Sequence, residues 1–306
     1  GDWSSDVCSS DLNSTKTHSK CADTSNPRTM TFRKLSPILA AKTAGLLILF
    51  LLGNGIIGLL ASFFTHKTGM GGKMILADDG SLLLTTTAFA VASIIGYVFV
   101  AAGAISLSWA KLSFRSERSI SFGIPYLRVL HFAGCLLVAA IGLQWMMAPL
   151  HIELTPLETK TFDAIAHDGF AVFVVVILGP FVEELVFRAG IFRLLHKKIG
   201  VLQAMVISSL LFGIVHGNLS QGIPAAILGM ALALLYFRSD DLRLCFPAHV
   251  VNNAFAVLAL HFPAMENWGA DWPAAIQVLL GLLLLVLGFA GLMMRGSLFS
   301  KQHKNA

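Results

Sequence analysis

Eight apolar segments, most of them long enough to cross a lipid bilayer, restrict the fold of this 306-residue chain more than any other feature of its sequence. A membrane-spanning helix needs about 20 mostly apolar residues. Only 13% of the residues are charged, whereas soluble domains carry about a quarter. We therefore predict an all-α fold, a polytopic membrane bundle of about eight transmembrane helices. The segments lie near residues 37–64, 83–110, 126–150, 169–195, 201–216, 223–237, 247–261 and 273–294.

Basic residues occur mainly in alternate loops, which predicts the orientation of the chain. Cytoplasmic loops of membrane proteins carry an excess of Lys and Arg. The loop at 151–168 is mainly acidic and the loop at 261–272 has no Lys or Arg, while Lys67 and Lys73 are a mild exception. We expect an integral protein of the bacterial cytoplasmic membrane with both termini cytoplasmic. The basic residues of the other loops and ends are Arg28, Arg33, Lys34, Lys111, Arg115, Arg118, Arg128, Arg193, Lys197, Lys198, Arg238, Arg243, Arg295, Lys301 and Lys304.

The stretch GPFVEELVFRAG, at 179–190, places ionisable residues inside the fourth apolar segment. Charges in hydrocarbon cost a few kcal/mol or more and usually mark functional sites. Pro180 either kinks this helix or starts a new one, and a new helix would have both glutamates near its positive end. Glu184 and Arg188 are four residues apart and can form an ion pair, whereas Glu183 points about 100° away around the helix. The sequence therefore predicts one neutralised glutamate and one available glutamate.

Two further segments carry polar groups that can reach Glu183. His216 follows Ile199 by about as many residues as Glu183 precedes it, so an antiparallel pair of helices would place both at one level. In CFPAHVVNN, Pro247 favours a helix start, after a partly extended approach through SDDLRLCF. His249 and Asn253 are then four apart on one face, while Asn252 points elsewhere. A carboxylate, two imidazoles and an amide are the groups that a hydrolytic site needs.

The three motifs together resemble one known family. EELVFR fits EExxxR, FGIVH fits FxxxH and HVVNN fits HxxxN, in this order on consecutive apolar segments. The chain thus looks like a member of the CAAX-protease and bacteriocin-processing family of intramembrane proteases, also called Abi proteins. The resemblance implies an endopeptidase that hydrolyses peptide bonds of a membrane-associated protein or peptide. It assigns the catalytic residues Glu183, Glu184, Arg188, His216, His249 and Asn253.

By this resemblance, Glu183 and His216 activate water, Glu184 and Arg188 brace the helix, and His249 and Asn253 bind the oxyanion. A divalent metal such as Zn²⁺ stays open: Glu183, His216 and His249 would make a three-ligand site, yet no HExxH motif is present. The expected partners are membrane lipid and a peptide or membrane-protein substrate, with no nucleic acid. The oligomeric state and the substrate are not indicated.

Two other functions fit the same residues. A carrier for protons or ions also places ionisable groups within its spans, although no second half of the chain mirrors the motif-bearing one. A non-catalytic membrane scaffold or immunity protein could keep the groups for packing.

Four regions follow from this interpretation. Residues 1–29 are expected to be a disordered or artefactual extension, since the first twelve resemble a translated sequencing adapter and Met30 is the expected start. N-terminal transmembrane helices occupy 30–165, the catalytic core 166–262, and the last transmembrane helix and a cytoplasmic tail 263–306.

Overall fold

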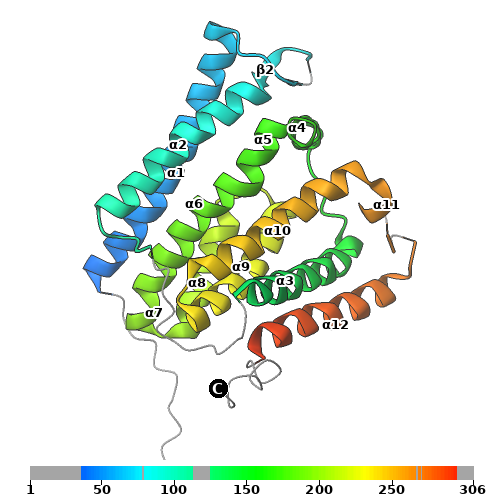
Figure 1. Ribbon diagram of the computed structural model, residues 1–306. Helices are drawn as coiled ribbons and strands as arrows, with labels where there is room; N and C mark the ends of the chain where they lie inside the picture. The colour runs from blue at the N-terminus through cyan, green and yellow to red at the C-terminus, as the bar shows by residue number, and fades with distance from the viewer. Residues whose placement is uncertain (1–35, 78, 113–124, 267, 270, 295–306) are drawn as a thin grey trace, which may run out of the picture. The chain divides into compact units, whose positions relative to one another are not determined.

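The computed structural model of the protein describes residues 36–77, 79–112, 125–266, 268–269 and 271–294, which belong to one unit, Arg33–Ala306 (Figure 1). The predicted extension at 1–29 lies outside the described residues, and so does the tail beyond residue 294. The same holds for eight of the basic residues used to predict the orientation, namely Arg28, Arg33, Lys34, Arg115, Arg118, Arg295, Lys301 and Lys304.

Helices form nearly all of the regular structure that is described. The N-terminal half contains α1 (Pro37–Thr68), α2 (Thr86–Ser106), α3 (Pro125–Met147), the 3-10 turn η1 (Ala148–Leu150) and α4 (Pro156–Ala166). Strands β1 (Met74–Leu76) and β2 (Leu82–Thr85) pair antiparallel between α1 and α2. The C-terminal half contains α5 (Gly169–Phe173), η2 (Val174–Leu178), α6 (Gly179–Val186), η3 (Phe187–Phe192), α7 (Arg193–Ile199), α8 (Val201–Ile214), α9 (Leu219–Ser239), α10 (Leu242–His261), α11 (Pro263–Glu266) and α12 (Ala274–Met293).

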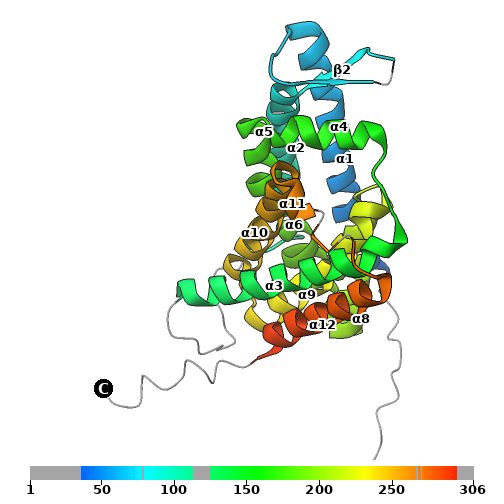
Figure 2. The same cartoon turned by 90° about the vertical axis from the view of Figure 1, so that its right-hand side faces the viewer.

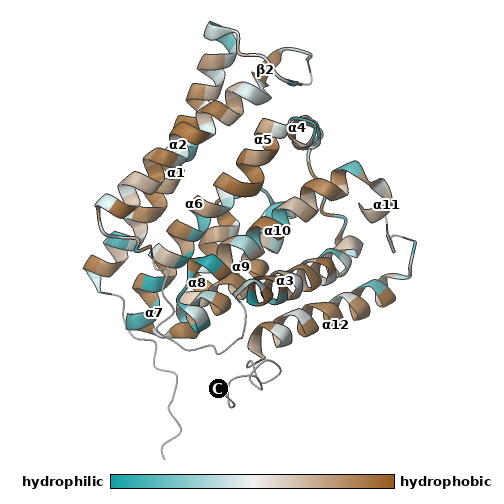
Figure 3. Cartoon of the chain, in the orientation of Figure 1, coloured by the Kyte–Doolittle hydropathy of each residue, from teal (hydrophilic) through white to brown (hydrophobic). Residues whose placement is uncertain are grey.

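Within the described residues, seven helical spans are long and apolar enough to cross a membrane. They are α1, α2, α3 with η1, the run from α5 to α7, α9, α10 and α12. Figure 3 shows the apolar colour along most of α1, α2, α3 and α12. The eighth predicted segment forms α8, whose 14 residues extend about 21 Å, less than the hydrocarbon thickness of about 30 Å. The predicted polytopic helix bundle is confirmed, with α8 too short to span alone.

The predicted helix break at Pro180 is wrong. Residues Gly169–Ile199 form one continuous helical span, in which η2 before Pro180 and η3 after it are π-helical. A proline lacks an N–H and crowds the carbonyl four residues earlier, and a wider π turn relieves that crowding. Glu183 and Glu184 therefore lie within a continuing helix, and the first-turn dipole does not stabilise them.

The predicted extended approach to Pro247 is also wrong. Helix α10 already begins at Leu242, and the Asp241 side chain caps it by accepting a hydrogen bond from the Arg243 backbone N–H at 2.9 Å. The Arg243 guanidinium also contacts the Asp241 carboxylate at 2.7 Å. Pro247 therefore lies inside a helix that has already begun.

The first of the three motifs lies on the most enclosed of the seven spans, the α5–α7 run. The α5–α7 run packs against α2 and α10, α8 packs against α9, and α3 packs against both α10 and α12. Figures 1 and 2 show α3 beside α12, and α10 between α3 and α6. Leu185, Phe187 and Ile191 of the α5–α7 run are completely buried in the main hydrophobic cluster. Polar side chains on this run must therefore find partners on neighbouring helices.

Candidate active site

Glu184 and Arg188 form the predicted ion pair in the interior. Glu184 Oε1 lies 3.4 Å from Arg188 Nη1, and both side chains are only 1% exposed. Arg188 also donates from Nη2 to the carbonyl oxygen of Gly229 at 3.3 Å and stacks over the Phe212 ring, 4.4 Å from its centroid. These contacts offset part of the cost of burying the charge. The pair joins α6 and η3 to α8 and α9.

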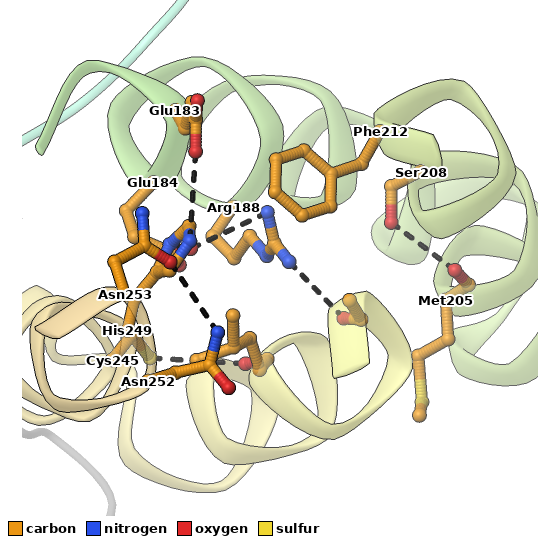
Figure 4. Close-up of polar contacts among 12 residues, drawn as sticks. Glu183, Glu184, Arg188, Met205, Ser208, Phe212, Cys245, His249, Asn252 and Asn253 are labelled. Atoms are coloured by element: carbon orange, nitrogen blue, oxygen red, sulfur yellow. Dashed lines mark hydrogen bonds and ion pairs between the residues drawn. The ribbon is translucent and has the colours of Figure 1, made fainter. Parts of the chain in front are cut away.

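Glu184 also holds His249, a contact that the sequence analysis did not predict. His249 Nδ1 lies 2.9 Å from Glu184 Oε1. An ionised carboxylate can only accept hydrogen bonds, so Nδ1 carries the proton in this contact. The ring therefore turns its Nε2 towards Glu183, whose Oε2 lies 3.6 Å away. Figure 4 shows both contacts meeting at the His249 ring. A carboxylate that fixes the tautomer of a histidine is a recurring device of active sites.

Glu183 differs from Glu184 in its surroundings. Its side chain is 17% exposed and lines a cavity of about 400 Å³, whereas Glu184 is sealed between Arg188 and His249. The predicted pairing of Glu184 with Arg188 is confirmed, whereas Glu183 lines the cavity with His249 beside it. Glu183 can therefore meet a molecule that enters the cavity.

His216 lines the same cavity but does not belong to α8 as the sequence suggested. Helix α8 ends at Ile214, and His216 lies in the turn before α9, whose first residues are capped by Asn218. Its Nδ1 lies 2.8 Å from the carbonyl oxygen of Phe212. Because a carbonyl accepts, Nδ1 carries a proton in this contact. The Phe212 ring stands edge-on to both His216 and His249, with centroid distances of 5.0 and 5.8 Å.

Asn253 and Asn252 both line the cavity, so the prediction that Asn252 points elsewhere is wrong. Asn252 Nδ2 donates to Asn253 Oδ1 at 3.3 Å, and Asn253 Nδ2 donates to the carbonyl oxygen of Val175 at 3.1 Å. A helical stripe facing a cavity can be wider than the 100° between neighbouring residues. Asn252 therefore fixes which side of the Asn253 amide donates.

The acceptor of Asn253 is created by the π turn. In η2, the Gly179 N–H bonds back to the carbonyl of Val174, five residues earlier. Continued by one residue, this pattern pairs the Val175 carbonyl with Pro180, which has no N–H. The Val175 oxygen is thus free of a helical donor and accepts from Asn253 instead. Pro180 therefore shapes the site by freeing an acceptor.

The cavity walls are largely apolar around this polar group. They come from α3, α4 and the loop before it, the α5–α7 run, and the segments from α8 to α10. Ser220 and Gln221 add polar groups near the start of α9. The apolar lining residues are Leu136, Leu154, Phe162, Ile165, Val175, Phe212, Pro224, Ala225, Leu228, Leu232, Ala256, Val257 and Leu260. Such a lining fits a mostly apolar molecule that places one polar group beside Glu183.

The three expected metal ligands do not fit a zinc site in this arrangement. Among the residues that the structure describes, no three His, Cys, Asp or Glu side chains are grouped so as to hold a metal ion. Glu183 and His249 face each other at 3.6 Å, while His216 is held at the Phe212 carbonyl. We therefore derive no step through a metal.

Comparison with known proteins agrees with the motifs. Residues 166–255 match the family model described as "Type II CAAX prenyl endopeptidase Rce1-like". This match agrees with the resemblance of the three motifs to the CAAX-protease and bacteriocin-processing family. The Rce1-like segment contains Glu183, Glu184, Arg188, His216, His249, Asn252 and Asn253.

A curated relative supports the same family. The chain is 32% identical over 123 residues to a protein named "Putative membrane peptidase YdiL" from Bacillus subtilis (strain 168). The alignment covers 40% of this chain, and it spans about half (50%) of the length of that relative. No solved structure matches the chain. Together with the apolar helices, the Rce1-like segment identifies an integral membrane protein.

Proposed function

We propose that the protein is an intramembrane endopeptidase that uses a water molecule activated by Glu183. The observation that carries this proposal is the asymmetry between the two glutamates. Glu184 is enclosed by Arg188 and His249, whereas Glu183 faces the cavity with one oxygen towards His249. An available carboxylate within reach of a water molecule can serve as a general base.

The proposed reaction begins when Glu183 takes a proton from water and the hydroxide oxygen bonds to the carbonyl carbon of the substrate. The carbonyl π electrons move to its oxygen, which becomes the oxyanion of a tetrahedral intermediate. Collapse of this intermediate breaks the C–N bond, and the amine leaves with the proton that Glu183 holds. The products are a carboxylic acid and an amine, and Glu183 is again a carboxylate.

His249 and Asn253 would stabilise the oxyanion. One N–H of the Asn253 amide is held by Val175, so the second N–H is available for the substrate. His249 has a carboxylate near each nitrogen, so its ring is held in place before a substrate enters. Donors fixed before the reaction stabilise developing charge most effectively. His216, which lines the same cavity, would orient the attacking water together with Glu183.

The test compares wild type with Glu183→Gln, which keeps the shape of the side chain and removes the base. The probes are internally quenched peptides ending in a CAAX sequence, one farnesylated and one not, in detergent micelles. We expect wild type to cleave and the variant to lose roughly 10²- to 10⁴-fold in kcat/KM. Comparing the membrane proteomes of cells that express each form then identifies natural substrates.

Two results would contradict the proposal. Equal cleavage by both forms contradicts the proposal, as does an ion flux in proteoliposomes that Glu183→Gln abolishes. The second result would support a carrier. Metal analysis and a chelator test whether Zn²⁺ is needed, and full activity in a metal-free preparation supports the glutamate-activated water.

We also propose that both termini face the cytoplasm of a bacterial cell. The basic residues of alternate loops support this orientation. Single cysteines placed in the loop at 151–168 and at the C-terminus, labelled from outside intact cells, provide the test. Labelling of the C-terminus with protection of the loop contradicts it.

A further inference from the structure

Tyr97 brings a hydroxyl group from α2 to the edge of the proposed active site. Its ring is half-buried and packs against the main hydrophobic cluster and against a second cluster of α1 and α2. The hydroxyl lies over Gly179 of α6, where the helix surface has no side chain. A methyl group placed on Gly179 would meet Tyr97 Oη at 3.3 Å and Glu183 Oε1 at 3.9 Å. The hydroxyl and the carboxylate therefore share the space above one glycine.

The two oxygens of Glu183 have different neighbours. Oε2 faces His249, whereas Oε1 lies on the side of Gly179 and Tyr97. Buried tyrosine hydroxyls usually have a hydrogen-bond partner. No hydrogen bond joins the Tyr97 hydroxyl to another protein group in the described part of the chain. Glu183 Oε1 is the charged acceptor close to it.

We propose that Tyr97 is a positioning residue for Glu183, and this inference rests on the proposed function. Its hydroxyl donates to Oε1, directly or through one bridging water, and holds the carboxylate with Oε2 towards the cavity. A methyl group at Gly179 would touch both the Tyr97 hydroxyl and Glu183 Oε1, so a side chain at this position disturbs their arrangement. The first transmembrane helices, outside the matched segment 166–255, thereby take part in the chemistry.

The test is Tyr97→Phe, assayed with the quenched peptide that wild type cleaves. Phenylalanine keeps the ring that packs against both clusters, so the variant should melt within a few degrees of wild type. Hydrogen bonds to charged groups are stronger than neutral ones, so we expect kcat to fall about tenfold with little change in KM.

The pH profile separates positioning from a structural role. A carboxylate that loses a donor is more easily protonated, so the acidic limb of the profile should move to higher pH in Tyr97→Phe. The other groups around Glu183 are His249 of α10, His216 after α8, and Glu184 on its own helix. All three are unchanged in the variant, so the shift reports the loss of the hydroxyl.

Gly179→Ala provides an independent test from the other side of the contact. The glycine has helical backbone angles, with φ −56° and ψ −60°, so alanine fits the backbone. Its methyl group must displace the Tyr97 hydroxyl by a few tenths of an ångström. We expect a several-fold loss of kcat, and the double variant should be no less active than Tyr97→Phe, because both changes remove one interaction.

The outcomes distinguish this inference from the function on which it rests. Activity that persists in Glu183→Gln overturns both. An inactive Glu183→Gln together with a Tyr97→Phe that keeps the kcat and pH profile of wild type overturns the role of Tyr97 alone. Losses that add fully in the double variant also overturn it, because they would show that Gly179 and Tyr97 act separately.

Discussion

Where α3 meets α12, glycines bring two backbones together, whereas where α6 meets α10, ionised side chains fill the space between the helices. A methyl group on Gly142 would lie 2.6 Å from the carbonyl oxygen of Gly281, so the first interface is already in contact. The second contains Glu184, Arg188 and His249 in one buried network. Small residues are the usual means of packing membrane helices.

This difference between the two interfaces indicates which of them contributes to the proposed reaction. The glycine contacts of α3 and α12 depend on shape, with a polar contact of His131 Nε2 to the Gly291 carbonyl oxygen at 3.1 Å beside them. The charged network is costly and would be a poor way to pack helices. We infer that it is kept because it orients His249 and leaves Glu183 facing the cavity. Four changes can break or sharpen this comparison.

The largest expected effect is that of Arg188→Met. The variant leaves Glu184 buried without its cation, which costs about 3–5 kcal/mol when one partner of a buried pair is removed. Unfolding in mixed micelles of mild detergent and SDS measures the loss. The double variant Glu184→Gln/Arg188→Met should recover much of this stability, since it removes both charges, and yet remain inactive. If the double variant is as unstable as the single one, the unpaired charge of Glu184 is not the cause of the lost stability.

Gly142→Ala should destabilise the protein by about 1–3 kcal/mol through overpacking of α3 against α12. Its methyl group meets backbone atoms at 2.6 Å, which cannot move aside as a flexible side chain does. Gly134→Ala on the same helix is the matched control, because nothing lies within 4 Å of its added methyl. The control should be neutral or stabilising by up to about 1 kcal/mol. Equal effects of the two variants would contradict close packing at this interface.

Asn252→Ala tests the polar network with a smaller expected effect. The variant removes the donor that fixes the Asn253 amide. One neutral hydrogen bond contributes about 1 kcal/mol, so kcat/KM of the proposed peptidase should fall about fivefold. The melting temperature should change little, because Asn252 is only half-buried. An unchanged kcat/KM would show that Val175 alone orients Asn253.

Local patterns in the sequence predict part of this site. The pairing of Glu184 with Arg188 follows from their four-residue spacing on one helix. The eight apolar segments are predicted because a helix that crosses lipid needs a long run of apolar residues. The contact of Glu184 with His249 depends on how two helices rotate against each other, which no local spacing contains. Tyr97 is missed for the same reason, since it lies outside the motifs.

The two prolines show a different limit of sequence reasoning. Proline predicts a helix break because it lacks an N–H. At Pro180 the π turn compensates, and the side chain of Asn253, 73 residues away in the sequence, donates to the freed Val175 carbonyl. At Pro247 the helix has already begun at Leu242, after the Asp241 cap. A proline alone therefore does not predict where a helix ends.

An effect of the same size as that of Asn252→Ala, but on stability, is expected at Asp168, which joins the N-terminal helices to the α5–α7 run. Its carboxylate caps α5 through the N–H groups of Phe170 and Ala171, both at 3.0 Å, and accepts the Thr86 hydroxyl at 2.6 Å. Burial by itself raises the pKa of Asp168, but these hydrogen bonds and the nearby Lys73 outweigh it, so the pKa is below its usual value. Asp168→Asn keeps the cap and loses the acceptor for Thr86, so we expect a loss of about 1 kcal/mol at pH 7.

The dependence of this loss on pH tests the cause. A carboxyl group with a lowered pKa stabilises the fold fully above its unfolded pKa of about 3.9, and this contribution disappears as the pH falls through the lower folded pKa. The difference in unfolding free energy between wild type and Asp168→Asn should therefore be constant from pH 7 to about pH 5 and shrink below about pH 4. Thr86→Val should reduce this difference at neutral pH. It removes the hydroxyl that donates to the carboxylate in wild type and that loses this acceptor in Asp168→Asn. A difference that stays constant down to pH 3 would mean that the ionised carboxylate does not hold α2 to α5, and that the two regions are joined by apolar packing alone.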